Sequence, residues 1–376
     1  MRPLQIFAGL AGLLSILKPI QASTVVDPKI AAKAAIDAMN NAFYNPSEGR
    51  WSPEIAWWIS GTALQAVLDY MHVTGSRDYL DQARYIVDKQ KAPVPGWPQG
   101  GGNFRADSTD DTAWWALAML RMFDLTGDKQ YLEVAKQDEQ YIWQYWTDTE
   151  CGGGIYVDIK ALTYKNAIAN ALYIKLAAGL HLRTGDSRYL TRALKTRQWF
   201  EESGMINAEG LANDGLTNDK ANQVCFNNEG PTWSYLQGTL IGGLVELSRT
   251  TPNEAYVRSA VTLANAVISS PKLTPQSTWV LTDYACEGTA AGCNFDQQSF
   301  KGIFARNLGE LDVLLRERPY RAYLEHNANS AYQTARNPAN GSYGTSWAGP
   351  YDGSNLAKQQ SAASLWVAVL QDQGTA

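Results

Sequence analysis

The stretch Thr126-Gly127-Asp128-Lys129-Gln130-Tyr131-Leu132 decides the fold, because it has the features of a turn between two helices. Glycine readily adopts the left-handed conformation that ends a helix. The aspartate that follows is a favourable N-cap for the next helix. The tyrosine and leucine then fall on the face of that helix that we expect to be buried. The stretch therefore predicts a helical hairpin.

The same phrase recurs along the chain, with its tyrosines roughly 50–70 residues apart. Clear copies lie at 74–80 and 184–190, and weaker copies lie at 251–257 and 318–324. Between the copies, apolar residues recur at intervals of three and four, as in Ala63, Val67, Leu68 and Met71. This period indicates amphipathic helices. The chain is therefore predicted to be a series of helical hairpins.

Counting these segments predicts an all-α chain with twelve helices. We place them near 29–45, 55–73, 77–91, 109–126, 128–146, 164–183, 186–203, 231–249, 253–270, 297–316, 319–335 and 356–371. Six hairpins in a ring would make an (α/α)6 barrel. An open superhelix is the alternative, because periodicity alone does not establish closure. No linker divides residues 23–376, so we expect a single catalytic domain there.

The ends and the composition indicate a secreted protein. Residues 1–22 have a positive start, an apolar run and a small residue at Ala22, as in a secretory signal. A first core helix or a membrane anchor is the alternative, but Lys18 and Pro19 end the apolar run too early to span a bilayer. The C-terminal apolar run, 364–370, is too short for a lipid-anchor signal. We expect a soluble, secreted monomer, with cell-wall association as a further option.

The charge balance argues against several classes of partner. The formal net charge is -5, and Lys and Arg form no run, so neither nucleic acid nor an anionic membrane is an expected partner. We expect no transmembrane segment. No metal or cofactor is expected either, because the cysteine spacing is unlike a zinc site and the chain has only three histidines.

Four cysteines fit a secreted protein. Cys286 and Cys293 flank a short loop and could close it as a disulfide, which would leave Cys151 to pair with Cys225. Four cysteines permit three pairings, so the other two stay open. Asn340-Gly341-Ser342 is a glycosylation sequon with Asn340 as the acceptor.

The segment Asp107-Ser108-Thr109-Asp110-Asp111-Thr112-Ala113-Trp114-Trp115 is the candidate for chemistry. It opens a helix at the end of the barrel opposite the tight turns, where the long loops gather, and loops on a rigid scaffold often carry function. Trp114 and Trp115 each follow an aspartate by four residues and so share its helix face. The alternative is an ordinary acidic helix start, with Ser108 as N-cap and the two acids favouring the positive helix end.

Adjacent carboxyl groups and abundant aromatic rings together suit glycoside cleavage. One carboxyl must donate a proton to the leaving oxygen, while the other attacks the sugar or activates water. Ionising one of two neighbouring acids raises the pKa of the other, which separates their roles. The chain also has 13 Trp and 19 Tyr, and such rings stack on the apolar faces of sugars. Asp110 and Asp111 are therefore the predicted catalytic pair.

Several motifs in a fixed order make the chain resemble glycoside hydrolase family 76, the α-1,6-mannanase family. They are Trp57-Trp58 with Ser60-Gly61, Asp110-Asp111 with Trp114-Trp115, Gly152-Gly153-Gly154-Ile155-Tyr156, Tyr164-Lys165-Asn166-Ala167-Ile168-Ala169-Asn170, Tyr235 with Gln237-Gly238, and Phe300-Lys301-Gly302-Ile303-Phe304-Ala305-Arg306. The resemblance covers nearly the whole chain after the signal and implies an (α/α)6 barrel.

The resemblance also implies site roles. Asp110 would be the nucleophile and Asp111 the general acid/base of a retaining mechanism. Asn166, Tyr235, Gln237 and Lys301 match family motifs and would line the groove with Trp114 and Trp115; capping helices or holding loops is the alternative for Asn166 and Lys301.

The function implied by the resemblance is a secreted endo-α-1,6-mannosidase that hydrolyses α-1,6-mannan. One alternative is a cell-wall transglycosidase that passes mannose-containing anchor glycans to wall polysaccharide through the same covalent intermediate. A second is a catalytically silent polysaccharide-binding protein. A third, a helical-ring cyclase that protonates an alkene, fits a secretory signal poorly.

Overall fold

The computed structural model describes residues 26–52, 56–93, 102–219, 224–251 and 253–371, so the predicted signal at 1–22 lies outside the described residues. Twelve α-helices occur in this part of the chain, in the predicted order and within a few residues of the predicted ends. They are α1 (Pro28–Phe43), α2 (Trp57–Thr74), α3 (Leu80–Gln90), α4 (Thr109–Thr126), α5 (Lys129–Trp143), α6 (Ala167–Thr184), α7 (Ser187–Glu202), α8 (Ser234–Thr250), α9 (Glu254–Ser269), α10 (Phe300–Leu314), α11 (Arg321–Thr334) and α12 (Leu356–Leu370).

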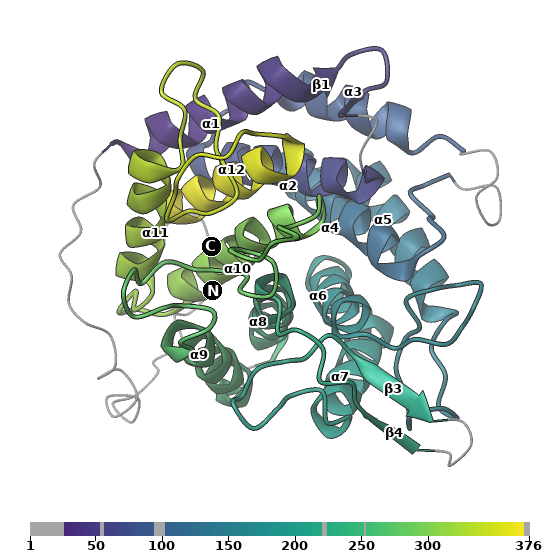
Figure 1. Cartoon of the computed structure of the whole chain (residues 1–376). Coiled ribbons are helices and arrows are strands. Elements are labelled where there is room, and N and C mark those ends of the chain that lie inside the picture. Colours follow the sequence, from purple (N-terminus) through teal and green to yellow (C-terminus); the bar gives the residue numbers. More distant parts are fainter. Residues whose placement is uncertain (1–25, 53–55, 94–101, 220–223, 252, 372–376) are drawn as a thin grey trace.

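The helices form two concentric rings (Figure 1). The even-numbered helices make the inner ring, in which each contacts the next and α12 packs against α2. The odd-numbered helices lie outside them. Because the last inner helix meets the first, the barrel is closed. The prediction of an (α/α)6 barrel is confirmed, and the open superhelix is wrong.

Burial explains which helices lie inside. In α2 every residue from Trp58 to Met71 is buried, whereas the outer α5 buries only part of its surface. A helix that is apolar on all sides must be surrounded by other helices. Inner helices also approach closely at glycines, since a Cβ atom at Gly302 would lie 2.4 Å from the backbone of Ser361. None of the described helices is long and apolar enough to cross a membrane.

The repeated turns have the predicted geometry in the three clear copies. Gly75, Gly127 and Gly185 all adopt the left-handed conformation, at φ 72°, 70° and 70°. Asp128 and Asp186 accept hydrogen bonds from backbone N–H groups of α5 and α7. The threonine before each glycine also contributes, because its hydroxyl donates to a carbonyl four residues back.

Two details of the repeat differ from the prediction. In the first copy Ser76 does not cap α3, which begins later, at Leu80, without a side-chain cap. In the fourth copy α8 ends at Thr250 and the capping residue Thr251 is extended, although Asn253 caps α9 as predicted. The hydrogen-bonding of the first turn of each helix therefore varies, while the hairpin itself persists.

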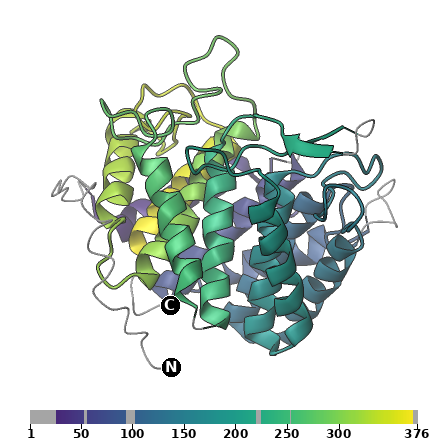
Figure 2. The same cartoon turned by 90° about the horizontal axis from the view of Figure 1, so that it is seen from below.

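Short strands and two disulfides shape the loops. Strand β1 (Tyr44–Asn45) pairs with β2 (Arg50–Trp51), and β3 (Leu216–Asp219) pairs with β4 (Val224–Asn227), both antiparallel. Figure 2 shows β3 and β4 at the same end of the barrel as the long loops. The disulfides are Cys151–Cys225 and Cys286–Cys293, as predicted. The first ties the loop before α6 to β4. The strands were not predicted.

Candidate active site

The two aspartates lie in the first turn of α4, at the loop-rich end of the barrel. Both are half-buried, and the backbone N–H of Asp111 donates to Asp110 Oδ1 at 3.0 Å. Thr109 anchors this turn, because its N–H donates to the Val157 carbonyl at 3.0 Å and its hydroxyl donates to the Tyr156 carbonyl at 2.9 Å. The loop before α6 therefore holds the acid pair in place. Ser108 precedes α4 but makes no side-chain cap.

The surroundings separate the pKa values of the two acids. Burial raises the pKa of Asp110, while hydrogen bonds from Ser108 and from backbone N–H groups lower it. Burial raises the pKa of Asp111 well above its ordinary value, and the negative charges of Asp110, Asp296 and Asp107 raise it further. Asp111 therefore keeps its proton to a higher pH than Asp110. One neutral and one ionised carboxyl is the state that glycoside cleavage requires.

Tyr235 is a predicted site residue that the structure brings to the acid pair. Its ring stacks on Phe300, with centroids 3.8 Å apart and planes at 6°. Burial raises the pKa of Tyr235 well above its ordinary value, and the nearby charges of Asp214, Asp110 and Asp296 raise it further. The phenol is therefore a neutral hydroxyl among carboxylates.

Asp296, whose charge acts on the pair, and Asp214, whose charge acts on Tyr235, are acids that the sequence did not predict as site residues. Tyr164 donates a hydrogen bond to the Asp214 carboxylate, and Asn228 Nδ2 donates to the Tyr164 hydroxyl at 2.9 Å. The available signal for Asp214 was its place in a Gly- and Asn-rich loop at the loop-rich end. Asp296 carried no such signal, because only folding brings it across the barrel to α4.

Trp114 and Trp115 lie inside the barrel. Trp115 is 0% exposed and packs in a cluster with Phe104 and Trp57, at centroid distances of 4.8 and 4.9 Å. Trp114 is 2% exposed and stacks on Trp58 at 5.5 Å. This corrects the prediction that the two rings line the groove, because a sugar needs an open ring face. They support the first turn of α4 from behind.

Three other predicted groove residues bond to the protein itself. Asn166 caps α6 by accepting from the Ala169 N–H at 3.1 Å. Gln237 is fully buried, and its amide accepts from the Ala212 N–H and donates to the Ala212 carbonyl. Lys301 is also buried, and its Nζ lies 2.6 Å from Glu287 Oε1. These contacts correct the prediction for Gln237 and Lys301, whose polar groups hold loops, and they give Asn166 the capping role that was its alternative.

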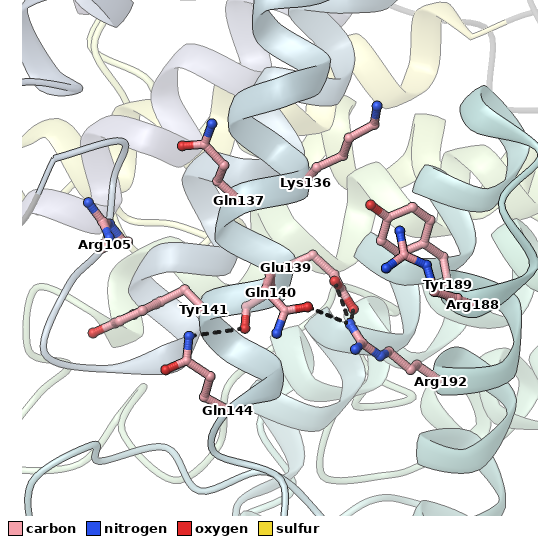
Figure 3. Close-up of a pocket in the computed structure, with 10 residues that line it drawn as sticks. All are labelled: Arg105, Lys136, Gln137, Glu139, Gln140, Tyr141, Gln144, Arg188, Tyr189 and Arg192. Carbon is pink, nitrogen blue, oxygen red and sulfur yellow. Dashed lines mark hydrogen bonds and ion pairs between the residues drawn. The ribbon is translucent and has the colours of Figure 1, made fainter.

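Two surface pockets lie away from the acid pair, on the outer wall of the barrel. Figure 3 shows the larger, of about 470 Å³, between α5 and α7, where Arg192 pairs with the buried Glu139 at 3.0 Å. The other, of about 350 Å³, lies between α7 and α9 and has largely apolar walls. Neither is lined by Asp110 or Asp111. The candidate active site is therefore defined by its carboxyl groups.

Comparison with known proteins agrees with this fold. Residues 26–375 match the model of glycosyl hydrolase family 76. Mannan endo-1,6-alpha-mannosidase DCW1 of Candida albicans is 27% identical over 362 residues, covering 89% of this chain and 77% of that protein. The protein of the same name from Saccharomyces cerevisiae is 26% identical over 356 residues, covering 90% and 77%.

A solved structure has the same fold. It is an inactive variant of the alpha-1,6-mannanase GH76A of Salegentibacter sp. HEL1_6, in complex with alpha-1,6-mannotetrose. The TM-score is 0.81 at 23% identity, and the match covers 92% of this chain and 99% of that one. The family match spans almost all of the chain. This protein therefore belongs to glycosyl hydrolase family 76 and is a glycoside hydrolase.

Proposed function

We propose that the protein is a secreted endo-α-1,6-mannosidase that hydrolyses α-1,6-mannan with retention at the anomeric carbon. The observation that carries the proposal is the pair of neighbouring carboxyls with separated pKa values at the start of α4. Asp110 is the nucleophile and Asp111 the general acid/base. The relatives named as mannan endo-1,6-alpha-mannosidases support the substrate.

The Salegentibacter mannanase supports the role of the pair. Its inactive variant has two consecutive aspartates replaced by alanine, and that variant is in complex with an α-1,6-linked mannotetraose. In a homologous barrel, such a pair is the counterpart expected for Asp110 and Asp111.

The mechanism follows from the two protonation states. Asp111 donates its proton to the glycosidic oxygen while the Asp110 carboxylate attacks the anomeric carbon, so that the shortened chain leaves and a glycosyl-enzyme ester forms. The Asp111 carboxylate then takes a proton from water, whose oxygen attacks the same carbon and breaks the ester. Asp110 is released as a carboxylate and Asp111 regains its proton. Two inversions at one carbon give net retention.

Secretion is supported by the signal-like residues 1–22 and by the cysteines. All four cysteines of the chain are in disulfides, which persist in oxidising compartments. Asn340 lies in an exposed turn, where its side-chain oxygen accepts from the N–H and hydroxyl of Ser342. This turn would present the sequon to a glycosylating enzyme.

The decisive experiment compares variants of the two acids on α-1,6-mannan oligosaccharides. Asp110→Asn and Asp111→Asn should each lower kcat/KM at least about 10³-fold with an unchanged far-UV CD spectrum. Asp81→Asn is the matched control, because that side chain is 98% exposed on α3 and loses the same charge. Near-normal turnover by both active-site variants would overturn the proposed mechanism.

Further measurements test the covalent intermediate, the stereochemistry and whether the products come from hydrolysis or transglycosylation. With an aryl α-mannooligoside that has a good leaving group, Asp111→Ala should still form the glycosyl-enzyme, because departure then needs no acid. NMR of the first product should show the α-anomer, and a β-anomer would mean inversion. Products longer than the input oligosaccharide would show that transglycosylation, and not hydrolysis, is the main reaction.

A further inference from the structure

The loop before α10 carries Asp296, whose charge acts on both members of the acid pair. The loop follows the Cys286–Cys293 disulfide and leads through the short helix η3 (Gln297–Ser299) into α10. Asn294 and Gln297 exchange hydrogen bonds of 2.9 and 3.0 Å between side chain and backbone. The Gln298 N–H donates to the Asn294 carbonyl at 3.1 Å. The loop is therefore braced on both sides of Asp296.

Trp58 fixes the direction of the Asp296 side chain. Its indole Nε1–H donates to Asp296 Oδ1 at 3.0 Å, a bond between residues 238 apart in the sequence. The Trp58 ring stacks on Trp114, which lies one helical turn beyond Asp110 in α4. A continuous chain of contacts therefore runs from the loop before α10, through α2, to the first turn of α4. The carboxyl of Asp296 is held beside the pair.

We propose that Asp296 is a positioning residue for the reaction, whose fixed negative charge keeps the proton on Asp111 until the glycosidic oxygen takes it. This inference rests on the proposed roles of Asp110 and Asp111. Asp296 forms no bond to the substrate in this scheme and acts only through the second carboxyl.

The charged groups around Asp111 support this role. From its own segment, Asp110 and Asp107 face it, and Ser108 provides a hydrogen bond that lowers its pKa. From the loop before α10, the charge of Asp296 raises the pKa of both members of the pair. The three charges with the largest effect on the pKa of Asp111, those of Asp110, Asp296 and Asp107, are all negative.

The carboxylates around Asp111 differ in how strongly water and neighbouring groups screen their charges. Lys160 lies 3.7 Å from Asp107, and both side chains are more than half exposed, so water and the lysine screen that carboxylate. On the side of α8, Tyr235 stays neutral beside Asp110, with Asp214 beyond it. Asp296 is half-buried and bonded by a neutral indole, so its charge is not compensated by that partner. Like charge at short range keeps a carboxylic acid protonated.

Asp296→Asn isolates the charge from the hydrogen bond. The asparagine side-chain oxygen can still accept from Trp58, so the loop keeps its anchor while the negative charge is lost. Without that charge both acids ionise more readily. We expect the alkaline limb of the kcat/KM profile to move to lower pH by about one unit, and the acidic limb to move less. At a pH one unit above the original limb, activity should fall about tenfold.

Matched variants separate charge from structure. Asp296→Glu restores the charge and should return the alkaline limb to within about 0.3 pH unit of wild type. Asp81→Asn removes one charge at the opposite end of the barrel and should leave the profile unchanged. A purely structural role for Asp296 would lower kcat at every pH without moving either limb.

An unmoved alkaline limb in an active Asp296→Asn protein would overturn the inference. If that variant is inactive at every pH, ¹³C NMR titration of its aspartate carboxyls measures the protonation of Asp111 directly. The Asp111 signal is assigned by comparison with Asp111→Asn. An unchanged Asp111 titration there also overturns it. Retained activity in Asp110→Asn and Asp111→Asn would instead refute the proposed function itself, so the two failures are distinct.

Discussion

Replacing Trp115 by alanine tests whether the tryptophans behind the acid pair pack the barrel or bind sugar. The ring is 0% exposed and packs against Phe104 at 4.8 Å and Trp57 at 4.9 Å, which also contact each other at 6.2 Å. Removing a buried tryptophan costs about 3–5 kcal/mol, which includes the cavity that remains. We therefore expect a loss of about 4 kcal/mol in the free energy of unfolding.

The contacts of the ring place the expected loss in the upper half of that range. A Cβ atom at Gly61 would lie only 3.1 Å from the Trp115 ring, so α2 already approaches this side closely. The cavity left by alanine would be bordered by packed inner helices that cannot easily collapse into it. Trp115→Phe keeps one aromatic ring packed against the two partners and should lose roughly half as much.

Urea unfolding followed by far-UV CD measures the stability, and steady-state kinetics on α-1,6-mannan oligosaccharides measures binding. Below the unfolding transition, KM for Trp115→Ala should stay within about twofold of wild type, because a fully buried ring offers no face to a sugar. A change of under about 1 kcal/mol in unfolding free energy, together with a tenfold rise in KM, would refute the packing role.

Three other predictions concern the buried charges and the disulfides. Burial raises the pKa of Glu310, but Lys175, Arg121 and Arg249 lower it overall to about 2. Its stabilising effect is therefore complete above the ordinary carboxyl pKa of 4.5 and is lost as the pH falls toward 2. Glu310→Gln should lack this acid dependence in urea unfolding and cost about 3–5 kcal/mol at neutral pH, because Lys175 loses its partner at 2.7 Å. Lys301→Met should cost a similar amount of unfolding free energy, because the buried Glu287 loses its partner, and should leave KM within about twofold of wild type. A large rise in KM at normal stability would indicate that Lys301 contacts the substrate. Removing the Cys151–Cys225 disulfide, with a sequence separation of 74, should cost about 4.5 kcal/mol of unfolding free energy. Removing Cys286–Cys293, with a separation of 7, should cost about 2.5 kcal/mol. The reverse order of unfolding midpoints would contradict loop entropy as the cause.

The helices were predictable because their signals are local. A glycine that ends one helix, an acid that caps the next and an apolar period of 3.6 all act within a few residues. The predicted ends of α4 coincide with the observed Thr109–Thr126. The cap of α3 was harder to predict, because Ser76 forms hydrogen bonds with several residues near it in sequence. Whether Ser76 caps α3 depends on the residue at which that helix begins.

The site was predictable only in part. The acid pair could be proposed as catalytic because adjacent carboxyls at a helix start are a local pattern with a chemical meaning, and its place in the first turn of α4 is as predicted. The orientation of the neighbouring side chains was not, since an aromatic ring or an amide next to a motif can face either the groove or the core. Trp115 and Gln237 turned inward, where stacking and backbone hydrogen bonds satisfy them.

The helical hairpins, their order and the place of the two aspartates at the start of α4 could be inferred without a structure, because each depends on contacts between near neighbours in the chain. The closure of the ring from α12 to α2, and the side chains that meet inside it, became known only from the folded barrel. Asp296 approaches the pair because Trp58, 238 residues away in sequence, holds it there. Such a contact exists only after the barrel has closed, so no local pattern specifies it.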